Sequence, residues 1–333
     1  MKKIIIIIIA VCMMPLFSCS AVIESQLESL GEKLDELGEE LDENSEYIVE
    51  IGSKPQIEIN KDDKLKTRKF DIVNYNALSV GYSFQVVMCD TVDSVTVRVN
   101  EKLDKYLVVK VKNGTLVITL ERIGGIKSDN TKCGYVYLPY NLKLSSFDLS
   151  GTSSFSTMLP INVTNCSIDL SGASSFKSNV NCTKYSADLS GTARCRTDVK
   201  CKQAYIDLSG ASKHESNIEC SSLTTDLSGT AKLKGNIKTN RINAEISGAS
   251  QLVLAGRCDK ATVDMSGTGK LDCKKLRISN LSGDMSGASK AIVTCSEHLS
   301  MELSGTSHLI YYGNPKADID ASMATTVERK GEN

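Results

Sequence analysis

Apolar and polar residues alternate along most of this chain, and a four-residue motif sets the phase of the alternation. From Asp148 onward the sequence repeatedly reads an acid, a leucine-like residue, Ser and Gly. Successive motifs begin 18 to 21 residues apart, and their first residues are Asp148, Asp169, Asp188, Asp207, Asp226, Glu245, Asp264, Asp284, Glu302 and, in a degenerate copy, Asp320. A fixed period of this length is typical of a solenoid, in which a unit buries its apolar side only against a stacked neighbour.

Within each unit, apolar residues lie at odd distances from the acid and polar residues mostly at even distances. A period of two indicates β-strands, and no stretch between the motifs has a helical period. Short equivalent strands that follow one another in this way pair in parallel about 4.8 Å apart, and their crossovers are right-handed. The pattern therefore predicts an all-β fold, a right-handed parallel β-helix (a solenoid) with about 19 residues per coil.

The Ser-Gly pair marks a corner of each coil. Gly occupies the third position after the acid in nine copies, at Gly151, Gly172, Gly191, Gly210, Gly229, Gly248, Gly267, Gly287 and Gly305. Gly at a fixed point indicates a positive φ or a corner too tight for a Cβ atom. We expect the preceding acid to cap the corner by accepting backbone N–H groups in an Asx-type turn.

The residue after the Gly alternates between Thr and Ala through all ten copies, from Thr152 to Ala324. Two explanations fit this alternation. Large residues beside small ones would keep the packed volume of successive coils constant, or a 38-residue unit was duplicated. The substitution Ala211→Thr separates them, because only the packing explanation predicts a loss of stability.

Residues 51–147 lack the motif but contain further segments of alternating polarity, at residues 70–73, 83–87, 94–99, 106–111 and 115–120. Asn113-Gly114 joins the last two and is a strong signal for a β-hairpin. An open solenoid end exposes an edge that invites aggregation. We therefore expect residues 51–147 to form an N-terminal β cap or irregular first coils, residues 148–325 the repetitive β-helix, and residues 326–333 a C-terminal tail.

Residues 1–18 have the features of a secretory signal peptide. Lys2 and Lys3 precede an apolar run that is too short for a mature membrane-spanning helix. The segment ends in Leu16-Phe17-Ser18-Cys19, which resembles the lipobox of bacterial lipoproteins. The resemblance implies cleavage before Cys19, acylation of Cys19 and a lipid anchor in the outer membrane. The alternative is an ordinary signal peptide that happens to contain a Cys.

Residues 19–50 are predicted to form a short, acidic helical stalk or linker. Eleven Asp and Glu lie in residues 20–50, against a single Lys. Apolar residues recur there at heptad spacing: Ile23, Leu27, Leu30, Leu34, Leu37 and Leu41. This pattern predicts either a coiled coil, with a homo-oligomer formed through residues 23–41, or a single amphipathic helix, and Gly31 and Gly38 weaken the helix in both cases.

The stacked acids, the cysteines and the histidines are the candidates for chemistry. An acid column is compatible with Ca²⁺ binding, but each coil offers one carboxylate where Ca²⁺ needs several oxygen ligands, so we predict corner capping and no metal site. One column of the repeat contains four cysteines, Cys182, Cys201, Cys220 and Cys258. Their spacing is not that of a zinc site, and they are explained either by buried free thiols or by disulfides between neighbouring coils. His214 interrupts an apolar column and is interpreted as a hydrogen-bonded structural imidazole.

Composition excludes several classes of function. The 333 residues contain no Trp and only 5% aromatic residues, and no Lys/Arg block is interleaved with aromatics, so no nucleic acid is expected as a partner. The sequence offers no phosphate-binding loop and no Ser-His-Asp arrangement, so we predict no cofactor and no catalytic residues. One column six residues after the acid is basic and would favour anionic glycans: Lys213, Lys232, Lys270 and Lys290.

Taken in order, these features resemble the family of putative auto-transporter adhesin head GIN domain proteins. The similarity rests on Arg68-Lys69-Phe70-Asp71-Ile72, on residues 93–97 and 113–118 and on the Ser-Gly array, and it covers residues 66–325. It implies a β-helix, no established catalytic residues and adhesion at the cell envelope. We therefore expect a non-enzymatic envelope lipoprotein that binds a glycan or an envelope protein. The alternatives are a periplasmic structural or signalling lipoprotein, and a polysaccharide lyase or hydrolase on a pectin-lyase-like scaffold.

Overall fold

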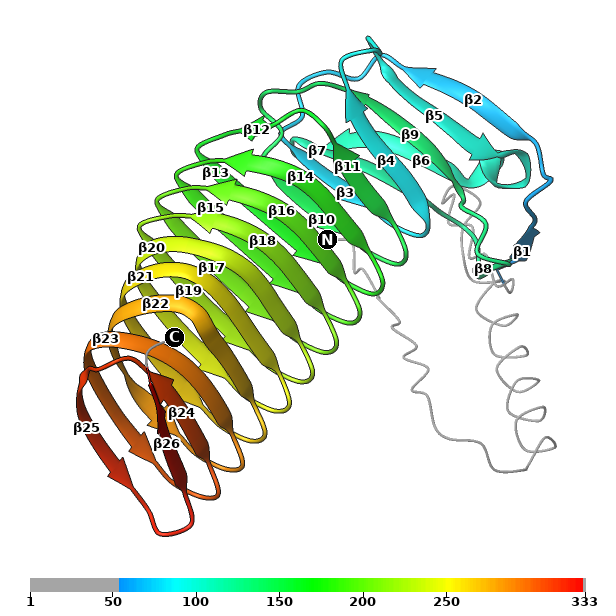
Figure 1. Ribbon diagram of the computed structural model, residues 1–333. Coiled ribbons are helices and arrows are strands. Elements are labelled where there is room, and N and C mark those ends of the chain that lie inside the picture. Colours follow the sequence, from blue (N-terminus) through cyan, green and yellow to red (C-terminus); the bar gives the residue numbers. More distant parts are fainter. Residues whose placement is uncertain (1–53, 332–333) are drawn as a thin grey trace, which may run out of the picture. The chain divides into compact units, whose positions relative to one another are not determined.

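The computed structural model describes residues 54–331, which form a β-solenoid (Figure 1). Strands account for 64% of the described residues and helix for 2%, and the solenoid has about 10 turns of roughly 19 residues each. The predicted β-helix and its period are confirmed. Within the described residues the helical segment is the short 3-10 helix η1 (Glu101–Tyr106).

Each regular coil contains two strands that meet at the Ser-Gly corner. The strand before the corner carries the acid, and in successive coils it is β10 (Ser146–Leu149), β13 (Asn165–Leu170), β15 (Lys184–Leu189), β17 (Gln203–Leu208) and β19 (Ser222–Leu227). The strand after the corner is β11 (Ser154–Thr157), followed by the short β12 (Ile161–Asn162), then β14 (Ser175–Asn181), β16 (Arg194–Lys200) and β18 (Lys213–Glu219).

Later coils join these two strands into one. The strand after one corner runs on into the strand before the next in β20 (Lys232–Ile246), β21 (Gln251–Met265), β22 (Lys270–Met285) and β23 (Lys290–Leu303). The last strands are β24 (His308–Tyr312), β25 (Lys316–Ala321) and β26 (Thr326–Lys330).

Equivalent residues of successive coils pair in parallel, so each position of the repeat forms a column along the solenoid. The motif acids are direct partners, as Asp169 is of Asp188, and so are the leucines after them, as Leu170 is of Leu189. Because side chains alternate along a strand, both leucines point inward and are 0% exposed, whereas the acids point to solvent. Burying one such leucine contributes about 1.5–3 kcal/mol.

The Ser-Gly corner is built on glycines in the left-handed region of backbone space. The motif glycines from Gly151 to Gly305 have φ between 64° and 69°. A Cβ atom added at Gly229 would lie 2.6 Å from the carbonyl oxygen of Gly210 in the preceding coil. The same carbonyl accepts the backbone N–H of Thr230 at 2.7 Å and its hydroxyl at 3.2 Å. Corners of successive coils are therefore hydrogen-bonded directly to each other.

Two expectations about this corner are wrong. The motif acids do not cap it: they lie within strands and point outward, and Asp148 accepts a hydrogen bond from the Ser79 hydroxyl of the neighbouring coil at 3.0 Å. The alternating Thr and Ala residues are exposed, so they do not fill the core. In the Thr coils the hydroxyl donates to the Gly carbonyl of the preceding coil, as Thr192 does to Gly172 at 3.2 Å.

Residues 54–139 contribute both coils and antiparallel strands. β3 (Ala77–Val80) and β4 (Phe84–Cys89) form a coil that pairs in parallel with β10 and β11 on one side, and with β7 (Thr115–Leu120) and β9 (Gly134–Pro139) on the other. The strands that close this end are antiparallel, namely β6 (Leu107–Lys112) on β7, β5 (Val95–Asn100) on β9 and β2 (Leu65–Phe70) on β5. A small parallel sheet joins β1 (Gln56–Ile59) to β8 (Gly125–Ser128). Antiparallel pairing ends the parallel stack and protects its edge.

The coil of β3 and β4 lacks the motif because Tyr82 takes the place of the glycine. Val80 pairs with Leu149, Tyr82 has φ 59°, and the Tyr82 carbonyl accepts the N–H of Thr152 at 2.7 Å. The corner is thus reached by a residue in a conformation that side chains of this size rarely adopt.

The ends of the chain divide into described and undescribed parts. The hairpin predicted at Asn113-Gly114 is confirmed, since β6 and β7 pair antiparallel and the two turn residues have φ of 51° and 77°. Residues 326–330, expected to belong to a tail, form β26 and pair with β24. The signal peptide, Cys19 and the helical stalk were predicted within residues 1–50 and lie outside the described residues. Between residues 54 and 331, no helix has the length and apolar character needed to cross a membrane.

Candidate functional site

The solenoid presents two outward faces of opposite charge. We call the outer side of the strands before the corner the acidic face, and the outer side of the strands after the corner the basic face. On the acidic face the motif acids form one ladder from Asp148 to Asp320, with one carboxylate per coil. Burial and the neighbouring carboxylates raise the pKa of Asp169 and of Asp207. Among residues 54–331, no three His, Cys, Asp or Glu side chains are arranged to hold a metal ion.

Two outward columns of the basic face are rich in Lys and Arg. The column nearest the corner contains, in successive coils, Arg194, Lys213, Lys232, Gln251, Lys270 and Lys290. The predicted alignment of four lysines in one column is thereby confirmed. The next outward column contains Lys177, Arg196, Glu215 and Lys234. Neighbours within a column belong to adjacent strands, so the charges recur about every 4.8 Å along the solenoid.

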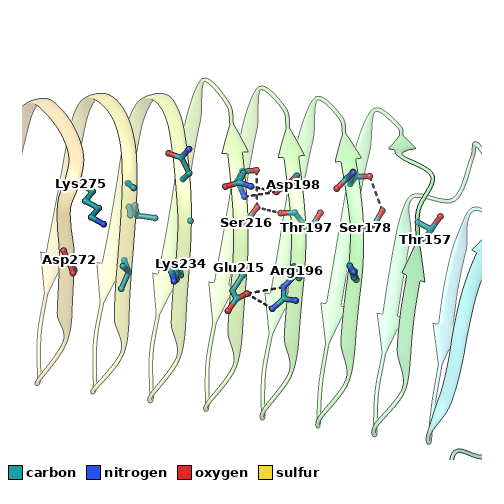
Figure 2. A pocket seen from close by; sticks show the side chains of 18 of the residues that line it. Thr157, Ser178, Arg196, Thr197, Asp198, Glu215, Ser216, Lys234, Asp272 and Lys275 are labelled. Carbon is teal, nitrogen blue, oxygen red and sulfur yellow. Dashed lines mark hydrogen bonds and ion pairs between the residues drawn. The ribbon is translucent and has the colours of Figure 1, made fainter.

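A groove of about 980 Å³ crosses several coils of the basic face. Figure 2 shows one row that contains Arg196, Glu215, Lys234 and Asp272, and a second row that contains Thr197, Ser216, Asp198 and Lys275. The first row is charged and also includes Lys177. The second row combines hydroxyl, amide and charged side chains and also includes Ser178, Asn179 and Asn217. The groove runs across the strands, from one coil to the next.

The groove lies where an inward-facing column of the basic face holds small residues. Ser178, Thr197, Ser216 and Gly235 occupy this column in successive coils, and Leu254 follows them. Ser178, Thr197, Ser216, Gly235 and Leu254 all belong to the lining, so the groove follows this column from coil to coil.

Side chains in the groove pair with partners one coil away. Arg196 Nη2 lies 2.8 Å from Glu215 Oε2, and this contact lowers the pKa of Glu215. Asn217 donates its side-chain N–H to Asp198 Oδ1 at 2.8 Å. Thr197 is 2% exposed, and its hydroxyl has no hydrogen-bond partner in the part of the chain that the structure describes. The groove therefore contains an ion pair and a hydrogen-bonded amide, and an unpaired hydroxyl is buried beneath it.

A second groove, of about 460 Å³, shares part of its lining with the first. The shared residues belong to the column that contains Asn179, Asp198, Asn217 and Asn236. Another lining pair is an ion pair, with Lys238 Nζ 2.7 Å from Glu219 Oε1. The two grooves make the middle of the basic face a continuous polar surface.

The buried histidine is structural. His214 is 0% exposed, lies in a core column between Cys195 and Leu233, and its Nε2 is 3.0 Å from the Tyr185 hydroxyl oxygen. Burial lowers the pKa of His214 to about 4, so the imidazole is neutral at pH 7. The interpretation as a hydrogen-bonded structural imidazole is confirmed.

Three of the predicted column of cysteines lie in consecutive coils, at the bend opposite the Ser-Gly corner. Cys182 and Cys201 are half-buried and Cys220 is buried, and all three are free thiols. The hydrogen bond with Cys201 lowers the pKa of Cys182. Thr239 stands in the next coil, where its hydroxyl oxygen is 3.4 Å from the Cys220 sulfur, and Cys258 follows one coil later. Of the two interpretations that the sequence offered, buried free thiols and disulfides between neighbouring coils, the structure has free thiols at these positions.

The groove is the part of the candidate site that the sequence did not predict. The repeat period predicts that charged residues stack in columns along the solenoid, but it does not predict the groove that these columns line. Its signal is present in the sequence, because Ser178, Thr197 and Ser216 interrupt a position of apolar phase in three successive units. That interruption acquires meaning only when the register shows that the three residues are stacked.

Comparison with known proteins identifies relatives of the chain. A family model described as "Putative auto-transporter adhesin, head GIN domain" matches residues 74–217 and 213–315. A putative adhesin from Parabacteroides merdae ATCC 43184 is 15% identical, with a TM-score of 0.48 and coverage of 82% of this chain and 99% of that chain. Two structures from Parabacteroides distasonis ATCC 8503 are each 18% identical and cover 82% of this chain: a putative adhesin, covered to 100% with a TM-score of 0.46, and a putative lipid binding protein, covered to 99% with a TM-score of 0.44. No curated protein matches the chain.

Proposed function

Because the chain belongs to the putative auto-transporter adhesin, head GIN domain family, we propose that it is a non-enzymatic adhesin of the bacterial cell envelope. The groove of about 980 Å³ on the basic face carries this proposal. It lies on strands whose backbone groups are paired on both sides, so recognition falls to the outward side chains. A rigid surface that repeats the same kind of contact suits an extended ligand, because linked weak contacts combine into strong binding.

The chemistry of the groove supports binding more than catalysis. A glycoside-cleaving site needs a carboxyl group whose pKa is raised so that it can donate a proton. Glu215 shows the opposite, because its contact with Arg196 lowers its pKa. His214, the nearest candidate base in these coils, is sealed in the core. Glu215 is thus held in its ionised form, which suits an ion pair in a binding surface better than proton donation.

We further propose that acylated Cys19 holds the protein in the outer membrane. The predicted acidic stalk or linker, residues 19–50, would then space the solenoid from the lipid surface. The support for this part of the proposal is the lipobox-like sequence before Cys19. Replacing Cys19 by Ala should abolish incorporation of labelled palmitate and release the protein into the soluble fraction. Unchanged labelling would show that Cys19 is not the acylated residue.

Two experiments test the adhesin role. Antibodies against residues 54–331 should label intact cells, and purified protein should bind to whole cells or to isolated envelopes. Labelling only after permeabilisation would place the solenoid in the periplasm and favour a structural or signalling lipoprotein. Turnover of a uronic-acid polysaccharide by the purified protein would instead favour the enzyme alternative.

A further inference from the structure

We infer that the groove on the basic face binds a linear polysaccharide that carries carboxylate groups, laid along the solenoid axis across successive coils. The inference rests on the proposed function and names the class of ligand. Three observations carry it: the direction of the groove, the spacing of its cations, and the hydroxyl and amide groups beside them.

The direction of the groove fits an extended polymer. Its lining comes from the same positions of β14, β16, β18 and β20, which are consecutive rungs of the solenoid (Figure 2). A compact ligand would touch one or two rungs, whereas a linear chain can contact every rung. Adjacent rungs are about 4.8 Å apart, a distance comparable with the advance of an extended pyranose chain per ring.

Cations lie in or beside the groove on each of these rungs. Lys177 on β14, Arg196 on β16 and Lys234 on β20 line the groove, and all three are exposed. On β18 the same column holds Glu215, which pairs with Arg196, and the exposed cation of that rung, Lys213, lies in the neighbouring column. A polymer with regularly spaced carboxylates would meet the ammonium groups of Lys177 and Lys234 in the groove.

The pair formed by Arg196 and Glu215 shows how a carboxylate fits this surface. The Arg196 Nε and Nη2 atoms lie 3.2 and 2.8 Å from the same oxygen, Glu215 Oε2. The guanidinium group therefore points along the solenoid axis and holds a carboxylate that belongs to the next rung. A ligand carboxylate could likewise lie one rung away from Lys177 or Lys234, where a single ammonium group would bind it as a point charge.

The second row of the groove suits the hydroxyl groups of a sugar. Ser178, Ser216 and Asn217 bring hydroxyl and amide groups to the groove in consecutive coils. The amide groups of Asn179 and Asn236 line the groove as well and are exposed, so they can hydrogen-bond to sugar hydroxyls.

Other polyanions fit the groove less well. Proteins that hold single-stranded nucleic acids stack the bases on aromatic side chains, and no aromatic residue lines this groove. Extended peptides usually bind a free strand edge or apolar pockets. Here the strands beneath the groove are paired on both sides, and most of its lining is charged or polar.

The test uses the chain from residue 20 to residue 333, which lacks only the predicted signal and acylated Cys, with polygalacturonate as probe. The groove variant carries Lys177→Gln and Lys234→Gln. The matched control carries Lys260→Gln and Lys316→Gln, which remove the same charge from the acidic face. All four lysines are exposed, so neither variant should lose the fold. Neutral amylose and polyglutamate serve as comparison ligands.

We expect polygalacturonate to bind, the groove variant to bind about tenfold more weakly and the control variant to bind as the parent does. Amylose and polyglutamate should both bind more weakly than polygalacturonate. Equal binding of amylose would refute the role of charge, and equal binding of polyglutamate would refute recognition of the sugar. An equal loss in both lysine variants would refute the groove as the site. If polygalacturonate does not bind but the protein still binds whole cells, this inference fails while the proposed function stands.

Discussion

Acidification should destabilise the solenoid through one buried side chain, His214. The imidazole is 0% exposed and its Nδ1 has no hydrogen-bond partner within the described residues. Burial therefore lowers its pKa from 6.5 to about 4. In the unfolded chain the same group titrates near 6.5, so between these two values the unfolded state binds more protons than the folded state. Stability then falls as the pH falls through this window.

The size of the effect follows from the shift in pKa. One unit of difference between the folded and unfolded states corresponds to about 1.4 kcal/mol. A shift from 6.5 to about 4 therefore predicts a loss of about 3 kcal/mol that starts near pH 6.5 and is complete near pH 4. Below that pH the folded protein also binds the proton, and this group causes no further loss.

The variant His214→Leu isolates this contribution. Leu fits the column, because Leu233 occupies the same position in the next coil. The variant loses the hydrogen bond to Tyr185, which should cost about 1 kcal/mol at neutral pH. Its stability should nevertheless fall less on acidification, by about 3 kcal/mol relative to the parent. Urea unfolding followed by circular dichroism at neutral pH and at about pH 4 measures this difference.

Comparison of the two proteins is necessary because other groups oppose the histidine. The pKa of Asp169 and that of Asp207 are raised, so protonating these carboxyls on acidification relieves repulsion and stabilises the fold. That contribution is the same in parent and variant and cancels in the difference. Equal loss of stability in the two proteins between neutral pH and about pH 4 would refute the argument from the buried neutral imidazole.

Three further predictions concern the columns of the solenoid. Gly229→Ala should lower the free energy of unfolding by about 2 kcal/mol, because Gly229 has a φ of 65° and the new Cβ would meet a carbonyl oxygen. Gly125→Ala is the control and should change the free energy of unfolding little, and thermal unfolding measures both variants. Asp207→Asn should raise the free energy of unfolding by about 0.5 kcal/mol at low salt by removing one of the stacked charges, and a gain that does not shrink in high salt would contradict this reasoning. Cys182 should react with maleimide more than about tenfold faster than Cys195, because the thiol pKa is lowered at Cys182 and raised to about 12 at Cys195; mass spectrometry of labelled peptides decides, and equal rates would refute it.

The sequence predicts the fold well where each unit repeats the same physical constraint. Period-two alternation in every unit specifies strands, and inward residues such as Leu170 and Leu189 can be buried only by stacking. The sequence allowed irregular first coils within residues 51–147 but did not identify the coil of β3 and β4, because Tyr82 stands where the motif has Gly. In this coil Ser79 pairs with Asp148, which lies far away in the sequence, and spacing along the sequence does not reveal a pairing across such a distance.

The position of the corner could not be predicted to the residue. An acid before Ser-Gly resembles a turn cap, and whether Asp188 belongs to the strand or to the turn depends on hydrogen bonds that local sequence leaves open. In the structure Asp188 pairs within β15, one residue before Leu189. For the same reason the sequence did not predict the role of Thr192. This residue lies outside the core, and its hydroxyl donates a hydrogen bond to the Gly172 carbonyl of the preceding coil.

The groove was beyond sequence reasoning for a different reason. Its rows of Lys and Arg are outward columns and follow directly from the period. Its lining combines residues of successive coils, such as Thr197 and Ser216, that only the register of the assembled solenoid brings together. No single unit encodes that arrangement.

Stacking in register ties the stability of this surface to its capacity to bind. The register that places leucine on leucine also places charge on charge, and like charges on adjacent strands repel one another. Lys213 and Lys232 are such neighbours, whereas Arg196 is relieved by Glu215. A ligand carboxylate on the basic face would relieve the repulsion between stacked cations that is present in the empty protein. This relief would contribute part of the binding free energy. Replacing Lys177 and Lys234 by Gln should weaken binding of a polyanion and change the stability of the empty solenoid by no more than about 0.5 kcal/mol. Lys177 is stacked on Arg196, which repels it, whereas Lys234 is stacked on Glu215, which attracts it, so the two losses oppose each other. A variant that lost both binding and stability would show that these lysines support the fold and not a ligand site.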